Sequence, residues 1–284
     1  MANKCTVRSI SFPTRSHPST LRVEEELNKL KNWEATSTSG SVFNGLSLLE
    51  ELYIRLDDLL NMGSTQQVIS RHQGEKFVQE LLDGSVRILD ICGITRDTML
   101  QMKENVQALH SALRRRKGDS SLEKSIAEYA FFTRKLKKNS NKFIRALKKI
   151  ESKFGVSPDV DPQLASVVKV LREAIAMNVS VFQSLLSFLA VPVPKANKWF
   201  LVARLVHRGV TACEENSENV NELQSVDAAL RTLLREGIDA QKLQTAHQRL
   251  EALEIVIESF ENSLESVFRR LIKTRSSLLN IISQ

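Results

Sequence analysis

The sequence has few of the residues that interrupt a helix. Its 284 residues include only 10 glycines and 6 prolines, and aromatic residues make up 6% of the chain. β-Rich folds need frequent turn residues between their strands, so this composition favours helices. Because 42% of the residues are hydrophobic and 26% are charged, the chain can bury a core, and disorder is not its default state.

Cysteine is also scarce, since only Cys5, Cys92 and Cys213 occur. An odd number of widely spaced cysteines supplies neither a disulfide framework nor paired zinc ligands, and it indicates a reducing compartment. The first residues lack the apolar core of a signal peptide. We therefore expect a cytoplasmic protein, either free or associated with a membrane. The Ser- and Arg-rich start of the chain gives only weak support for a plastid address.

Signatures of catalysis and ligand binding are missing too. The sequence has no G-x-S-x-G elbow, no phosphate-binding loop, no H-E-x-x-H and no paired C-x-x-C. The five histidines have no partner at metal-ligand spacing. We therefore expect no catalytic, cofactor-binding or metal-binding residues, no cofactor, and a protein that is not an enzyme. An enzyme would need a polar pocket between helices, which residue spacing cannot reveal.

The clearest positive feature is an apolar series over residues 239–283. Its members return in alternating steps of three and four, which places them on one face of a helix about 67 Å long. They are Leu243, Ala246, Leu250, Leu253, Ile257, Phe260, Leu264, Val267, Leu271, Leu278 and Ile281, and only Thr274 interrupts them. A helix of this length buries its face only against other long helices, such as the one predicted over residues 75–116.

This C-terminal helix could instead pair with a second copy of itself. The positions that flank its apolar face form a poor set of paired charges, and Val256 and Phe268 widen the face. A wide apolar face suits a helix that touches several neighbours in a bundle. We therefore predict packing within one chain, and we favour a monomer.

The predicted fold is all-α: an elongated antiparallel helical bundle with long, coiled-coil-like helices and a flexible N-terminal arm. Residues 1–41 form the Ser/Arg/Pro-rich arm, which contains a short helix and a linker, and residues 42–284 form the helical bundle domain. Further helices are predicted over residues 43–61 and 120–154, from Pro162 onward, from Trp199 onward, and from Ser217 to Arg235.

Residues 174–194 carry no charge, which raises the alternative of a membrane span. Ser180, Gln183, Ser184 and Ser187 share one helix face, opposite the apolar residues. A lipid environment favours apolar residues on all sides, so we predict a central helix of the bundle. The alternative function is a peripheral or anchored membrane protein that uses this segment and the basic helix 114–153.

Positive charge is concentrated in that basic region. The chain has a net charge of +7, yet residues 114–153 alone carry 14 Lys and Arg against 4 Asp and Glu. The candidate anionic-partner surface consists of Arg114, Arg115, Arg116, Lys117, Arg134, Lys135, Lys137, Lys138, Lys142, Arg145, Lys148 and Lys149. A solvated face near an acidic stretch of the same chain is the structural alternative.

Two kinds of partner suit this surface, an acidic protein and an anionic membrane. Nucleic acid is the partner that the sequence favours least, because we expect the aromatic residues of this helix on its apolar face, where they cannot stack on bases.

Several blocks of sequence resemble a land-plant family, the Bypass proteins. They are Val7–Pro18 leading into Val23–Leu27, Glu80–Ser85 with Leu89–Cys92, and Leu113–Gly118. The resemblance spans nearly the whole chain. It implies a largely helical protein of unresolved biochemistry, linked to root and shoot development through restraint of a mobile, root-derived signal, and it supplies no catalytic residues. We therefore expect a non-enzymatic helical interaction or regulatory protein.

Overall fold

The computed structural model describes residues 18–36, 42–115, 119–151, 162–190 and 221–283. These ranges contain eight α-helices and no β-strand: α1 (Pro18–Thr36), α2 (Val42–Leu60), α3 (Gly63–Arg71), α4 (Lys76–Arg114), α5 (Asp119–Glu151), α6 (Pro162–Ala190), α8 (Glu222–Glu236) and α9 (Ala240–Ile282). The helix predicted from Trp199 onward and most of the N-terminal arm lie outside them.

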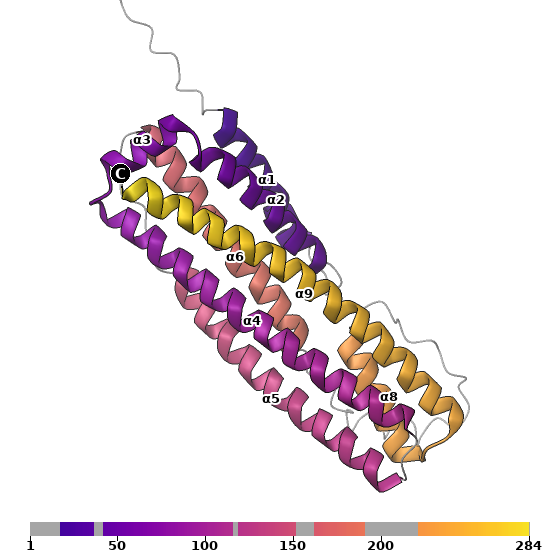
Figure 1. Ribbon diagram of the computed structural model, residues 1–284. Helices are drawn as coiled ribbons and strands as arrows, with labels where there is room; N and C mark the ends of the chain where they lie inside the picture. Colours follow the sequence, from indigo (N-terminus) through magenta and orange to yellow (C-terminus); the bar gives the residue numbers. More distant parts are fainter. Residues whose placement is uncertain (1–17, 37–41, 116–118, 152–161, 191–220, 284) are drawn as a thin grey trace, which may run out of the picture.

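The helices form an elongated bundle, as the sequence predicts. In Figure 1, α4 and α9 run antiparallel along its length, with α1, α2 and α3 toward one end and α8 at the other. Helix α9 packs against α4, α2 and α8, so its apolar face is buried within its own chain. The predicted intramolecular packing is therefore confirmed. Thr274, which interrupts the apolar series, is buried with it.

Polar contacts fix the register of α4 against α9. The carboxylate of Glu265 pairs with Arg96, and Glu261 Oε2 accepts a hydrogen bond from Lys103 Nζ at 2.6 Å. Nearer the α8 end, His110 Nδ1 lies 2.9 Å from Glu254 Oε1. As the contacting residue moves along α4 from Arg96 to His110, its partner moves back along α9 from Glu265 to Glu254, which is the order that antiparallel packing requires.

Helix α1 packs on α2 and α6, and its buried side chains belong to the same core as theirs. The contact is close because Gly45 of α2 has no side chain: a Cβ added there would lie 2.5 Å from the indole ring of Trp33. Val23, Leu27 and Leu30 complete the buried face, whereas Leu21 is exposed. The boundary between arm and bundle at residue 41 stays a prediction, since residues 37–41 lie outside the described ranges.

Helix α6 is the central helix that the sequence predicts. It packs against α1, α2, α4 and α5. By length and composition alone its stretch Leu164–Ala190 is apolar enough to cross a membrane, but 61% of its apolar 18-residue window is buried inside the bundle. Two of its polar side chains contact other helices, since Asn178 Nδ2 donates to the buried hydroxyl of Tyr53 at 2.7 Å and Ser180 Oγ donates to Glu34 at 2.5 Å on the surface.

Candidate anionic-partner surface

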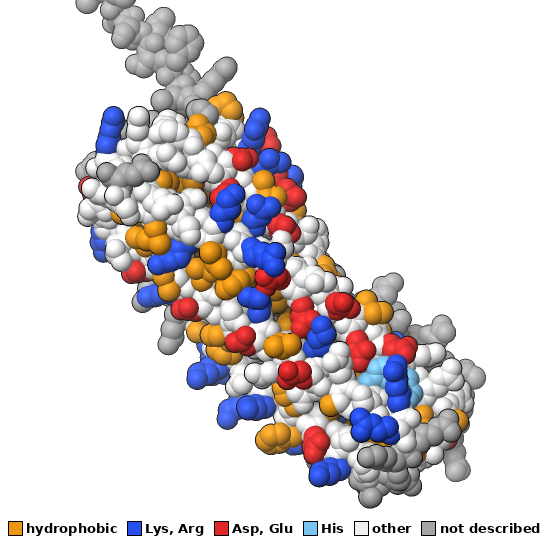
Figure 2. Space-filling model, in the orientation of Figure 1, with side chains coloured by type: hydrophobic (Ala, Val, Ile, Leu, Met, Phe, Trp, Pro, Cys, Tyr) orange, Lys and Arg blue, Asp and Glu red, His pale blue; other side chains and the backbone are white. Residues whose placement is uncertain are grey.

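Helix α5 carries most of the predicted surface, and its amphipathic sequence explains why the cations face outward. Its apolar residues recur at helical spacing and pack against α6, α4 and α8. The buried ones are Leu122, Ile126, Tyr129, Leu136 and Leu147. The Lys and Arg residues between them therefore project on the opposite side of the helix. Figure 2 shows such side chains along the edge of the molecule that α5 forms in Figure 1.

The structure divides the twelve predicted residues into groups. Arg114, Arg115, Arg134, Lys135, Lys138, Lys142 and Arg145 are exposed. Lys137 is half-buried, with its Nζ 3.4 Å from Asp227 Oδ2 of α8, so it serves the packing of the bundle. Arg116 and Lys117 lie outside the described residues, and the structure does not describe the side chains of Lys148 and Lys149.

We define the cationic face as the exposed residues Arg134, Lys135, Lys138, Lys142 and Arg145. At 100° per residue these five side chains leave α5 within a sector of about 100°. Among the described residues, none of the five has a carboxylate within 4.0 Å, whereas Lys137 on the same helix has one. Their charge is therefore available to a partner.

Two residues that sequence reasoning left out also lie on this side of α5. Lys124 is exposed there and extends the row of cations. Phe131 is 66% exposed and points into the centre of the same sector. The expectation that the aromatic residues of this helix all face the core is therefore wrong for Phe131. The sequence could have revealed this, because Phe131 lies seven residues before Lys138, which is about two helical turns and places both on the same side of the helix.

Arg114 and Arg115 are separate from the cationic face, at the C-terminal end of α4. Arg114 Nη2 lies 4.0 Å from Glu251 Oε1, and both side chains are exposed, so this pair contributes little to stability. Arg115 follows the last residue of α4, with its N–H directed at the carbonyls of Ser111 and Leu113. The structure thus brings five of the predicted cations together and places these two elsewhere.

A histidine pair lies close to that end of α4, and sequence reasoning missed it. The rings of His110 and His247 are 5.1 Å apart between centroids, and His110 also contacts Glu254. Burial, and then the proximity of His110, hold the pKa of His247 below its usual value. The described residues contain no group of three or more His, Cys, Asp and Glu that could hold a metal ion. The antiparallel register of α4 and α9 was the signal that could have found the pair.

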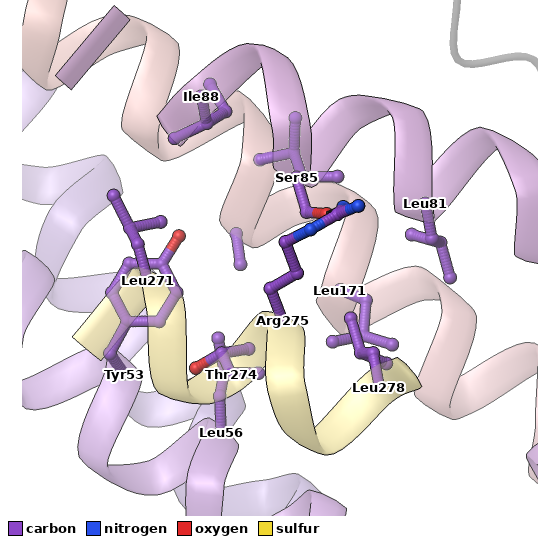
Figure 3. A pocket seen from close by; sticks show the side chains of 12 residues that line it. Tyr53, Leu56, Leu81, Ser85, Ile88, Leu171, Leu271, Thr274, Arg275 and Leu278 are labelled. Carbon is purple, nitrogen blue, oxygen red and sulfur yellow. Dashed lines mark hydrogen bonds between the residues drawn. The ribbon is translucent and has the colours of Figure 1, made fainter. Parts of the chain in front are cut away.

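A mostly apolar pocket lies where α2, α4, α6 and α9 meet (Figure 3). Arg275 of α9 extends across it to α4, where its Nη1 donates to Ser85 Oγ at 2.7 Å and to the carbonyl of Leu82 at 3.0 Å. The hydroxyl of Thr274 lines the pocket without a hydrogen-bond partner among the described residues. Tyr53 also lines it, but burial raises the pKa of its hydroxyl, so this group cannot act as a base near neutral pH.

Comparison with protein families gives a match to a family model. The model of the family described as Protein BPS1 matches residues 45–281, which is most of the chain and covers nearly all of α2 and α9 and the whole of each described helix between them. Comparisons with curated proteins and with solved structures gave no match. The match agrees with the resemblance to Bypass proteins, and the chain belongs to the BPS1 family.

Proposed function

We propose that this chain is a non-enzymatic interaction protein of plant development that attaches to an anionic membrane surface through the cationic face of α5. Membership of the BPS1 family suggests a developmental role and does not point to a known enzyme family. Family membership does not say what the protein binds, and the proposal names an anionic membrane surface as its partner.

The observation that carries this proposal is the exposed, unpaired charge of the cationic face. A carboxylate of the protein neutralises the charge of Lys137, whose partner is Asp227, whereas the five cations of this face have no such contact among the described residues. Each Lys or Arg near an anionic membrane surface contributes about 1 kcal/mol of attraction. A row of five therefore suffices for binding that depends on salt.

Phe131 favours a membrane over an acidic protein as the partner. Helices that lie on a membrane surface combine Lys and Arg with apolar side chains such as Phe, which enter the boundary between headgroups and acyl chains. Phe131 is 66% exposed at the centre of the cationic face, where it could enter the lipid headgroup region. Since α6 lies inside the bundle, attachment by α5 requires no insertion of residues 174–190.

Vesicle sedimentation tests the proposal with matched variants. We expect the protein to bind vesicles that contain phosphatidylserine at low salt, and to bind less at high salt. Charge reversal by Lys138→Glu and Lys142→Glu together should weaken binding by roughly tenfold or more. The same change at the exposed Arg231 and Arg235 of α8 is the control, and it should have a smaller effect.

Two results would count against this function. An absence of binding at low salt would exclude the membrane and leave an acidic protein as the partner to be sought. Equal losses in the α5 and α8 variants would mean that net charge matters and the cationic face does not. Phe131→Ala separates the aromatic contribution, because it should weaken binding without changing the salt dependence.

A further inference from the structure

A small polar pocket opens between α4 and α5, beside the cationic face. Its polar lining consists of Thr98 and Gln101 on α4 and of Lys135, Asn139 and Ser140 on α5, and the other lining residues are apolar. The empty space is about 310 Å³, part of which is open to solvent. Its enclosed part has room for about two water-sized groups, so a larger group would extend through the mouth.

Ser140 is the unsatisfied group in this pocket. The residue is 1% exposed, and its Oγ has no hydrogen-bond partner among the described residues. The other hydroxyl, that of Thr98, donates to the carbonyl of Ile94 at 2.7 Å and is satisfied within its own helix. A buried hydroxyl without a partner is unfavourable, so the geometry of the pocket calls for a group that accepts from Ser140.

The other polar side chains that line the pocket, apart from Thr98, can also donate hydrogen bonds to a ligand. Lys135 and the side-chain amides of Gln101 and Asn139 are exposed, and none of the three makes a side-chain hydrogen bond or ion pair with another described residue. No acidic residue lines the pocket, and Lys135 gives it a positive charge. The arrangement therefore favours an anion with several acceptor oxygens over a cation or a neutral apolar molecule.

We propose that this pocket binds a phosphate group, either the terminal phosphate of a membrane lipid or free phosphate. A phosphate monoester carries up to two negative charges and three terminal oxygens, which matches donors that approach from two different helices. A planar carboxylate offers only two oxygens and leaves more of these donors without a partner.

The lipid form of this inference rests on the proposed function. In that form the cationic face brings the protein to the membrane, and the pocket selects a phosphomonoester headgroup. Phosphatidic acid presents such a group, whereas the phosphate of phosphatidylserine is a diester with fewer terminal oxygens. Vesicles containing phosphatidic acid should therefore bind the full-length chain more tightly than vesicles of equal charge containing phosphatidylserine.

Lys135→Gln and Lys138→Gln form a matched pair for the test, because both remove one exposed charge from the same face and only Lys135 lines the pocket. We expect Lys135→Gln to weaken binding to phosphatidic acid vesicles by roughly tenfold, and to abolish most of their advantage over phosphatidylserine vesicles. Lys138→Gln should weaken binding to both kinds of vesicle by the same small factor.

Ser140→Ala tests the pocket without changing charge. It removes a buried hydroxyl that has no partner, so the melting temperature should stay the same or rise, while the preference for phosphatidic acid should fall. Titration with inorganic phosphate at constant ionic strength identifies the source. Tight binding of free phosphate without a preference among vesicles assigns the pocket to the free ion, and a preference for phosphatidic acid vesicles assigns it to the lipid.

If the two lysine variants have equal effects on every vesicle and free phosphate does not bind, the pocket is not a phosphate site, and the proposed membrane attachment still stands. If the chain binds free phosphate but no vesicle, the pocket is a phosphate site and the proposed membrane attachment is wrong. A phosphoserine peptide that binds more tightly than either source would overturn the assignment to lipid or free phosphate.

Discussion

Two tyrosines are buried, and only one of them has a hydrogen-bond partner for its hydroxyl among the described residues. The hydroxyl of Tyr53 accepts from Asn178 Nδ2 at 2.7 Å, while that of Tyr129 has no hydrogen-bond partner among the described residues. Burial raises the pKa of both groups, so both stay protonated at neutral pH.

We expect Tyr53→Phe to lower the free energy of unfolding by about 1–3 kcal/mol, because the amide of Asn178 loses an acceptor in the core. Tyr129→Phe should change it by less than about 0.5 kcal/mol or raise it, since no hydrogen bond is lost. Urea denaturation of both variants measures the difference. If both variants lose a similar amount of unfolding free energy, the hydrogen bond between Asn178 and Tyr53 does not stabilise the packing of α2 on α6.

Cys92 makes the stability of the fold change with pH in the alkaline range. Its thiol is buried against α9, where it lies 3.9 Å from the carbonyl oxygen of Leu264, and burial raises its pKa from 9.0 to about 12. The unfolded chain releases this proton near pH 9 while the folded chain keeps it, so the contribution of Cys92 is constant below pH 9 and decreases stability as pH rises toward 12.

We expect the free energy of unfolding to fall as pH rises above 9, and to fall less steeply in Cys92→Ala. The measurement is urea denaturation at a series of pH values, with Cys5 and Cys213 replaced by serine in both proteins. The cavity left by the alanine lowers stability at every pH, so only the slope is informative. An unchanged slope would contradict a buried, protonated thiol.

Sequence reasoning could find residues whose role depends on helical period alone. Leu250, Ile257 and Leu264 were placed on the buried face of α9 because period and burial are linked. The contact of Tyr53 with Asn178 could not be found this way, because it joins residues 125 positions apart. The unpartnered hydroxyl of Ser140 depends equally on how α5 lies on α4, which no local pattern specifies.

At the scale of elements, the close contact of α1 with α2 depends on Gly45. A side chain there would collide with the rigid ring of Trp33, whereas nothing lies within 4 Å of a Cβ added at Gly93 in α4. We therefore expect opposite effects on stability when each glycine is replaced by alanine, although both lie inside helices and both replacements raise helix propensity.

We expect Gly45→Ala to destabilise the protein by about 1–3 kcal/mol and to loosen α1, because the ring of Trp33 must move. Gly93→Ala should stabilise it by up to about 1 kcal/mol. Amide hydrogen exchange over residues 18–36 checks the first expectation, and thermal denaturation checks the second. Unchanged exchange in Gly45→Ala would mean that the indole ring repacks without cost.

Helix ends show where sequence signals for elements hold and where they fail. Glycine is the residue that most often follows a helix, and Gly237 follows α8 with a φ of 83°. Ser64 and Gln67 suggest a capping box by their spacing, yet α3 begins at Gly63 after Met62, without a side-chain cap. The box at the start of α8 uses Asn221 and Gln224 instead of a start near Ser217. Composition marks a helix end to within a turn, and the packing of the bundle decides between neighbouring candidates.

At the scale of the whole molecule, the burial of α9 within its own chain predicts the oligomeric state. The face that could have formed a zipper already contacts α4, α2 and α8. We therefore expect a monomer of 32.1 kDa by light scattering, with small-angle scattering that indicates an elongated shape. A concentration-independent mass of twice that value would show that another surface, such as the exposed apolar residues Ile255 and Ile272, mediates a dimer.

The pairing of α4 with α9 has a mechanical consequence. These helices have 39 and 43 residues, so each measures roughly 60 Å, and together they join the end that holds α1 to the end that holds α8. A bend in one rod is resisted by the side chains of the other along their shared seam. Two molecules held at opposite tips of the bundle would thus be kept a nearly constant distance apart, as by a rigid spacer.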